Sequence, residues 1–281
     1  RAIFGRDDEG EIVRRPPFLI IQDETHLISG PLGTMYGLYE SVIDVLCSTT
    51  INGVTVKPKI ICSTATIRGA KEQLKSIFAR ESFTPFPAPG IDIADSFFGC
   101  YAYEDNTNKL QPGRMYVGIH ASNFVSAQTT QVRVFSSILV NVENRIEESR
   151  RDPWWTILSF YNSLRELGGA RTLFQGDIRS RMKFLTHRDN LKFRKDPYLE
   201  ELSSRLRQDE IVGMLDQLNT PFPEVNDRPL DVCLASNIIE VGVDIDRLSL
   251  MAVNGQPKNT AQYIQVTGRV GRRWWERPGL I

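Results

Sequence analysis

The sequence predicts an α/β fold built from two domains, each with a parallel β-sheet. Two observations carry this prediction. Short apolar runs of strand length alternate with stretches of helical periodicity along the chain, which is the pattern of α/β units. Several of these apolar runs end at acidic or hydroxyl-bearing residues, and ligands of α/β proteins bind beyond the carboxyl ends of the strands.

The first predicted domain comprises residues 1–112. Its first strand is the apolar run Phe18–Gln22, whose continuous hydrophobicity is typical of a parallel sheet covered on both faces. The further elements expected here are a loop over 30–33, a helix over 35–46, a buried strand over 60–62, a helix over 68–80 and a long loop over 83–113.

The second predicted domain comprises residues 113–281 and repeats the alternation. Its segment 176–200 is too polar to assign to a helix or a strand. The elements expected elsewhere are helices over 127–149, 162–167, 206–218 and 259–266, and strands over 156–160, 232–235, 248–253 and from 279 onward.

Composition and charge are those of an ordinary globular protein. The 281 residues carry 34 basic and 34 acidic side chains, which excludes a globally basic nucleic-acid binder but not a local basic groove. The four cysteines have no paired spacing, which argues against a zinc site or a disulfide scaffold. Without a membrane-length apolar stretch or a signal peptide, we expect a reducing, cytoplasmic location.

The first predicted strand ends at two adjacent acids, Asp23 and Glu24, which Thr25 and His26 follow. Burying ionised carboxylates is unfavourable unless a cation or hydrogen-bond donors receive them. Here Asp23 can hold Mg²⁺, usually through water, and Glu24 can orient a water for in-line attack on a phosphoryl group. A solvated acid pair in a turn is the plain alternative, and the accompanying motifs weigh against it.

Three further polar stretches accompany the acid pair. Ser63–Thr66 follows the second strand, and its hydroxyls can hydrogen-bond the acids or His26. In the second domain, Ser236 closes a strand, and a loop with a glycine and an acid, 242–244, comes next. The stretch Gln265–Arg272 contains two arginines three residues apart, which can both point at one anion and grip phosphate.

These stretches resemble motifs II, III, V and VI of superfamily-two helicases: D-E-T-H, S-T-A-T, A-S-N-I-I-E-V-G-V-D-I-D and Q-V-T-G-R-V-G-R. Four motifs in the right order are jointly far more specific than any one of them. The resemblance covers residues 18–273 and implies two RecA-like lobes, with ATP and Mg²⁺ in the cleft between them and single-stranded nucleic acid across both. Residues 1–112 would then be the C-terminal part of a first lobe that is incomplete on its N-terminal side.

The resemblance also implies roles for individual residues. The nucleotide site would contain Asp23 for Mg²⁺, Glu24 for the attacking water, Arg269 and Arg272 as arginine fingers, Gln265 facing the cleft, and Gly242 and Asp244 near the nucleotide sugar. The residues that couple this site to the other lobe would be His26, Ser63, Thr64 and Thr66. Nucleic acid would contact Ser236, where the family usually has threonine, together with Asn162, Ser203 and Arg205.

Two longer stretches, IIQDETHLISGPLGTMYGLYE and FPAPGIDIADSFFG, are further similar to helicases of the bacterial DISARM phage-defence systems. This resemblance implies an ATP-driven motor that moves along a single strand. Its partners would be single-stranded or partly duplex nucleic acid, with DNA favoured over RNA, and a companion defence protein. No residue of the sequence identifies the surface that the companion would contact.

One departure from the family pattern concerns the phosphate-binding loop G-x-x-x-x-G-K-[ST], which has no match upstream of the acid pair. Together with chain ends that look internal, this indicates part of a larger protein. Two other functions stay open. An RNA helicase is one, since the D-E-T-H box argues only against the strict DEAD-box group. A catalytically inactive RecA-like pair that acts as a nucleic-acid-binding scaffold is the other.

We therefore expect the isolated 281-residue chain to hydrolyse no ATP above background, because it lacks the lysine and hydroxyl of the phosphate-binding loop. Steady-state ATPase assays with and without nucleic acid measure this. Nucleic-acid-stimulated turnover by the 281 residues alone would contradict the expectation.

Overall fold

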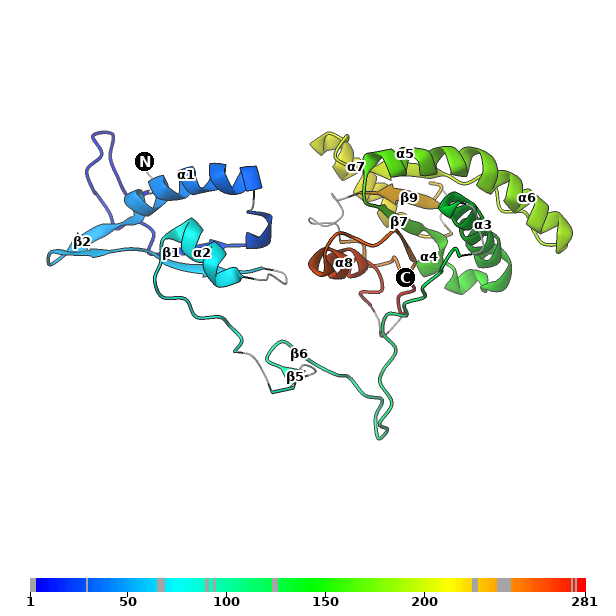
Figure 1. Cartoon of the computed structure of the whole chain (residues 1–281), viewed down its shortest axis with the longest axis horizontal. Coiled ribbons are helices and arrows are strands. Elements are labelled where there is room, and N and C mark those ends of the chain that lie inside the picture. The colour runs from blue at the N-terminus through cyan, green and yellow to red at the C-terminus, as the bar shows by residue number, and fades with distance from the viewer. Residues whose placement is uncertain are drawn as a thin grey trace. The chain divides into compact units, whose positions relative to one another are not determined.

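The computed structural model of the chain contains two compact units, Arg1–Tyr101 and Ala102–Ile281 (Figure 1). Each unit is described by itself. The division lies earlier in the chain than the predicted boundary at residue 112. The structure describes residues 4–28, 30–64, 69–88, 91–92, 95–122, 126–223, 227–236, 244–273, 275 and 277–281.

Unit 1 is built on two parallel strands, β1 (Leu19–Gln22) and β4 (Lys59–Cys62). Two helices accompany them, α1 (Gly30–Cys47) and α2 (Ala70–Phe78), whose Tyr36 and Phe78 rings pack edge to face with centroids 6.3 Å apart. The predicted loop over 30–33 is wrong, because α1 already begins at Gly30. A proline at the second helical position is compatible with this start, since the first N–H groups of a helix have no partner within it.

Two short antiparallel hairpins in unit 1 were not predicted. Strands β2 (Thr49–Ile51) and β3 (Val54–Val56) flank Asn52 and Gly53, which both have positive φ. Asn-Gly with this geometry is the preferred two-residue hairpin turn, so the sequence did contain a signal. Strands β5 (Asp95–Ser96) and β6 (Gly99–Cys100) form the second hairpin inside the predicted long loop.

The strands of unit 1 are not covered on both faces as predicted. Phe18 is 81% exposed and Ile21 is 68% exposed. Within the described residues, β1 and β4 pair only with each other. Helix α1 likewise exposes a stripe of apolar side chains, namely Leu32, Met35, Leu38, Val42 and Val45. The sequence correctly indicated apolar strands, but the described part of the unit supplies no second layer to cover them.

Unit 2 contains a parallel sheet in the order β10-β7-β9-β8, of which Figure 1 labels the central strands β7 and β9. The strands are β7 (Ile157–Tyr161), β8 (Leu199–Leu202), β9 (Val232–Ala235) and β10 (Met251–Asn254). Beyond β10, Leu280 bridges to Leu250 and Met115. The chain that enters unit 2 and the chain at its end are therefore hydrogen-bonded side by side, with Val117 N–H donating to the Ile281 carbonyl at 2.8 Å.

Helices cover both faces of this sheet and enclose two cores. One core contains Ile157 and Tyr161 of β7 and is covered by α3 (Ala127–Arg145), α5 (Leu164–Leu173) and α6 (Arg179–Arg188). The other contains Leu158 and Phe160 and is covered by α7 (Gln208–Asn219) and α8 (Thr260–Thr267). Alternate residues of one strand thus face opposite layers, as the pleat of a strand requires.

The remaining short elements are the 3₁₀-helices η2 (Thr25–Leu27) and η3 (Glu148–Arg150), the short helix α4 (Asp152–Trp155) and the π-helix η4 (Phe174–Ile178). The π-helix joins α5 to α6 without a break. Helix α6 lies within the segment 176–200 and strand β8 begins at its end, although the sequence predicted neither element. None of the helices in the described ranges is long and apolar enough to cross a bilayer.

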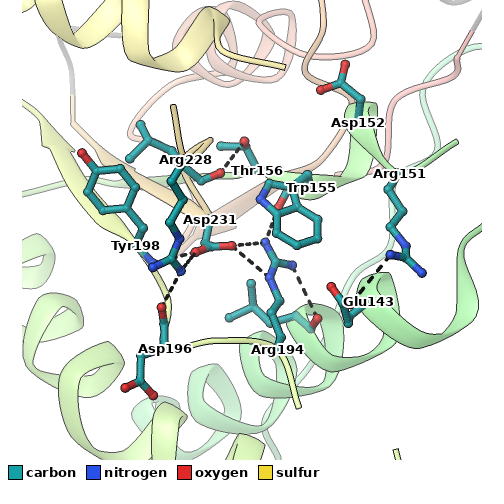
Figure 2. A network of polar contacts seen from close by, with 12 residues as sticks. Glu143, Arg151, Asp152, Trp155, Thr156, Arg194, Asp196, Tyr198, Arg228 and Asp231 are labelled. Atoms are coloured by element: carbon teal, nitrogen blue, oxygen red, sulfur yellow. Dashed lines mark hydrogen bonds and ion pairs between the residues drawn. The ribbon is translucent and has the colours of Figure 1, made fainter. Parts of the chain in front are cut away.

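A buried ion pair holds this unassigned segment against the sheet (Figure 2). Arg194, which is 2% exposed, pairs with Asp231, which is fully buried just before β9. The guanidinium also lies over the Trp155 ring, 3.7 Å from its centroid, and donates to the Trp155 carbonyl at 2.9 Å. Asp231 accepts further hydrogen bonds from Arg228 Nη2 and Tyr198 N–H, each at 2.7 Å. Both oxygens of this buried carboxylate therefore accept hydrogen bonds.

We expect Asp231→Ala to lower the free energy of unfolding of unit 2 by about 3–5 kcal/mol, because it leaves the buried Arg194 guanidinium without its carboxylate counter-charge. The matched change is Asp196→Ala, which removes an ion pair with Arg179 whose side chains are both nearly half exposed. That change should cost about 1 kcal/mol or less. Urea unfolding measures both, and equal losses would contradict the assignment.

Candidate nucleotide and nucleic-acid sites

The acidic loop of unit 1 is built by the parallel pairing of β1 with β4. Gln22 is the register partner of Cys62, so Asp23 and Ser63 leave the sheet at the same edge. Thr25 is fully buried and ties the two loops together: its hydroxyl donates to the Ser63 carbonyl at 3.1 Å, and so does its N–H. The predicted proximity of the acid pair to Ser63, the first residue of the S-T-A-T stretch, is therefore present in the structure.

Asp23 is exposed, and its carboxylate is held by two donors. Its Oδ1 accepts from the Ser63 hydroxyl and, at 2.8 Å, from the Glu24 N–H. The Ser63 hydrogen bond, followed by the backbone one, holds the pKa of Asp23 below its usual range. Asp23 is therefore ionised at neutral pH, as a Mg²⁺ ligand must be.

Glu24 has a left-handed backbone conformation, with φ of 51° and ψ of 40°. This region is rare for a residue other than glycine, asparagine or aspartate, and such residues cluster at functional sites. The Glu24 side chain is half exposed, and its Oε2 lies 3.3 Å from Nδ1 of the mostly buried His26. The residue expected to couple the two lobes thus contacts the expected water-activating carboxylate directly. Thr64 lies in the exposed loop beside Ser63, and Thr66 is outside the described residues.

In unit 2, the residues expected to contact nucleic acid follow neighbouring strands. Asn162, Ser236 and Ser203 come directly after β7, β9 and β8, which lie side by side in that order. They therefore share one edge of the sheet. The hydroxyl of Ser203 is buried and donates to the Glu201 carboxylate, while Arg205 Nη1 lies 3.6 Å from the same carboxylate. These side chains are engaged with Glu201 in this structure.

The other two residues at this edge are also tied into the fold. Ser236 is buried and its N–H donates to the Leu202 carbonyl at 3.2 Å. The Asn162 amide contacts the loop after β10, with the shortest distance, 3.3 Å, to the Gly255 carbonyl.

The arginine stretch begins in α8 and continues through a tight turn. Gln265 lies in α8, and Arg269 follows the helix, with its N–H donating to the Val266 carbonyl at 3.1 Å. Gly271 has a φ of +62°, and a Cβ there would lie 2.5 Å from the Cα of Gly279. No larger side chain fits at this turn without a backbone shift. The turn therefore fixes the direction in which the chain leaves Arg269 and reaches Arg272.

Arg272 forms an ion pair with Asp244, so two residues that the sequence assigned to one nucleotide site are in contact. The adjacent Arg273 pairs in the same way with Asp246, at 3.1 Å. This second pair was not predicted, although Asp246 and Arg273 lie within two residues of the first pair along the sequence. Gly242, the third residue assigned to this part of the site, lies outside the described residues.

Two further polar residues support these loops and had no sequence signal. Gln73 of α2 donates to the Ile28 carbonyl at 2.8 Å and so holds the end of the acidic loop. Arg114 donates to the carbonyls of Val270 and Gly268, at 2.8 and 3.2 Å, and so holds the arginine turn. Long-range contacts of this kind depend on the fold and not on local spacing.

Comparisons with known proteins agree with these motifs. The model of the helicase conserved C-terminal domain matches residues 161–273. The DISARM protein DrmA of Bacillus paralicheniformis is 42% identical over 273 residues, which are 95% of this chain and 23% of that protein. The chain therefore spans about a quarter of the length of this relative.

Solved structures show the shared fold. The DUF1998 helicase MrfA bound to DNA is 18% identical, with a TM-score of 0.51, over 93% of this chain and 30% of that one. Mycobacterium smegmatis Lhr bound to single-stranded DNA and AMP-PNP is 16% identical, with a TM-score of 0.49, over 93% and 28%. The predicted α/β class with RecA-like parallel sheets is confirmed.

Replacing Ser63 with alanine removes the donor that contributes most to the low pKa of Asp23, so that pKa should rise toward the ordinary aspartate value. Because the folded-state pKa is depressed, the stability contributed by Asp23 is present above about pH 4 and is lost as pH falls through the folded-state pKa. In S63A the folded-state pKa of Asp23 lies closer to the unfolded-state value, so this pH-dependent contribution to stability is smaller. Carboxyl ¹³C NMR titration measures the pKa.

The control is Ser41→Ala, which removes a hydroxyl that donates to the Gly37 carbonyl within α1. It should leave the Asp23 titration unchanged. An Asp23 pKa that is the same in S63A and in the wild type would contradict the assignment.

Proposed function

Since the chain carries a superfamily-two helicase C-terminal domain and is a DrmA-like member of these helicases, we propose that the whole protein is an ATP-dependent motor of a DISARM defence system. The motor moves along a single strand of nucleic acid, with DNA as the favoured substrate. The observation that carries this proposal is the pairing of an ionised Asp23 with Ser63, beside Glu24, at the carboxyl edge of parallel strands.

The acid pair fits a magnesium nucleotide. A Mg²⁺ ion keeps several waters and needs only one or two carboxylates together with substrate phosphates, so the single exposed carboxylate of Asp23 is a sufficient protein ligand. When bound, the ion would neutralise charge on the phosphates. Glu24 orients a water for attack on the terminal phosphoryl group, and His26, 3.3 Å away, reports the state of that carboxylate to the rest of the protein.

The arginine turn supplies positive charge for the same reaction. Arg269 and Arg272 stabilise charge on the transferred phosphoryl group, and Gln265 lies one helical turn earlier. In this structure Arg272 is paired with Asp244. We therefore infer that Arg272 exchanges Asp244 for phosphate when the nucleotide binds. The resemblance to superfamily-two helicases further assigns Gly242 and Asp244 to the nucleotide sugar.

The lobes and partners of the whole protein follow from the same assignment. Residues 1–112 form the C-terminal part of lobe 1, and residues 113–281 form lobe 2. The exposed apolar faces of β1 and α1 support an incomplete first lobe, because such faces are normally covered. A single strand contacts Asn162, Ser203, Arg205 and Ser236 along the edge of the unit 2 sheet. A companion defence protein and a cytoplasmic location complete the proposal.

Two alternatives predict different measurements. An RNA helicase requires that RNA, and not DNA, stimulates ATP hydrolysis by the full-length protein. A catalytically inactive scaffold requires that neither polymer does, and that no phosphate-binding loop precedes residue 1 in the parent gene. Stimulation by single-stranded DNA supports the motor.

In the full-length protein, Glu24→Gln should lower kcat for ATP by at least about 100-fold, because the amide cannot accept a proton from the attacking water. Nucleotide binding should persist, since Asp23 is unchanged. The control is Glu81→Gln, whose carboxylate pairs with Lys75 at the surface and is 87% exposed. Steady-state ATPase assays measure kcat. Turnover by E24Q equal to that of the control would contradict the assignment of Glu24 as the residue that activates the attacking water.

A further inference from the structure

A chain of hydrogen bonds leads from helix α1 to the backbone of the acidic loop. The Tyr36 hydroxyl donates to Gln22 Oε1 at 2.7 Å, and Gln22 Nε2 donates to the Asp23 carbonyl at 2.7 Å. The hydrogen-bonding partners of the Gln22 side-chain amide determine which of its atoms is the oxygen and which is the nitrogen. A backbone carbonyl can only accept, so Nε2 must face Asp23 and Oε1 must face Tyr36. The phenol is therefore the donor that holds Gln22 in the orientation that reaches Asp23.

The Asp23 carbonyl belongs to the peptide plane that joins Asp23 to Glu24. The other end of this plane is the Glu24 N–H, which donates to Asp23 Oδ1 at 2.8 Å. Fixing the carbonyl therefore also fixes the donor that helps to hold the Asp23 carboxylate. The same plane enters the left-handed conformation of Glu24. A strained backbone conformation persists only where the surrounding contacts determine it, and Gln22 supplies one of these contacts.

Tyr36 is well placed for this task. It is half-buried on α1, where its ring packs against Phe78 of α2. Burial, followed by the nearby Glu40 carboxyl, raises the pKa of Tyr36 to about 12, so the phenol keeps its proton at physiological pH. Glu40 itself is 3% exposed and lies one turn further along the helix.

We infer that Tyr36, acting through Gln22, is a positioning residue for the acid pair: it holds the peptide plane between Asp23 and Glu24 in the orientation that nucleotide hydrolysis requires. The inference rests on the proposed function, in that Asp23 and Glu24 act on a nucleotide. Neither Tyr36 nor Gln22 touches the nucleotide in this scheme, so their loss should affect turnover more than binding.

The test uses the full-length protein with Tyr36→Phe, Gln22→Met and the double variant. Tyr36→Phe removes the first hydrogen bond of the relay and Gln22→Met removes both, so kcat for ATP should fall about three- to tenfold in each variant while KM changes less than about twofold. Because both residues act along one path, the double variant should be no slower than the slower single variant. The matched control is Tyr39→Phe, which removes the hydroxyl of a tyrosine that is 67% exposed on the same helix.

A second readout needs neither nucleotide nor turnover. Amide hydrogen exchange of residues 23–28 in the nucleotide-free protein should be about threefold or more faster in Y36F and Q22M than in Y39F, because the loop opens more often. Faster exchange without a change in kcat would reduce Tyr36 to a structural role and overturn the inference. Additive effects of the two changes on kcat would also overturn it, because they would place the residues on separate paths.

Failure of the inference and failure of the proposed function give different results. If E24Q abolishes turnover and Y36F matches Y39F in both readouts, the inference fails and the motor stands. If the full-length wild type hydrolyses no ATP with either DNA or RNA, the proposed function fails and the inference falls with it.

Discussion

Parallel pairing between β1 and β4 is the constraint on which the acidic loop depends. The register that pairs Gln22 with Cys62 places Asp23 beside Ser63 through backbone hydrogen bonds. Thr25 then links the two loops, because its buried hydroxyl and its N–H both donate to the Ser63 carbonyl. A change in this register by one residue would turn every side chain of β1 to the opposite face. Backbone hydrogen bonds between two short strands thus determine where the carboxylates lie.

In unit 2 the buried ion pair and the candidate binding residues lie at opposite ends of the strands of the same sheet. The buried Arg194–Asp231 pair lies at the amino ends of the strands, where Asp231 precedes β9 and Trp155 precedes β7 (Figure 2). Ser203 and Ser236 lie at the carboxyl ends. The buried carboxylate at the amino ends is fully hydrogen-bonded, whereas the polar groups at the carboxyl ends are those that the proposed function assigns to nucleic-acid contact.

The apolar pattern of the sequence was sufficient to predict an element whose residues are all buried. Strand β9 has the predicted bounds, Val232–Ala235, because all four of its residues are buried and flanked by polar ones. The polar segment 176–200 could not be assigned, since β8 is partly exposed and α6 owes its position to tertiary contacts. The pairing of Asp23 with Ser63 was foreseeable because both follow parallel strands. The Tyr36–Gln22 relay was not, because its residues lie on different elements, 14 positions apart, and outside the D-E-T-H motif.

The left-handed backbone of Glu24 carries an evolutionary consequence. A conformation of this kind costs about 1–3 kcal/mol for a residue with a Cβ, and glycine would adopt it without that cost. Glycine, however, has no carboxylate. Stability alone would therefore favour glycine at this position, and the proposed role of Glu24 is what would require a carboxylate here. Under the proposed function, this one backbone conformation is a compromise between folding stability and catalysis, and a relative without the reaction would be free of it.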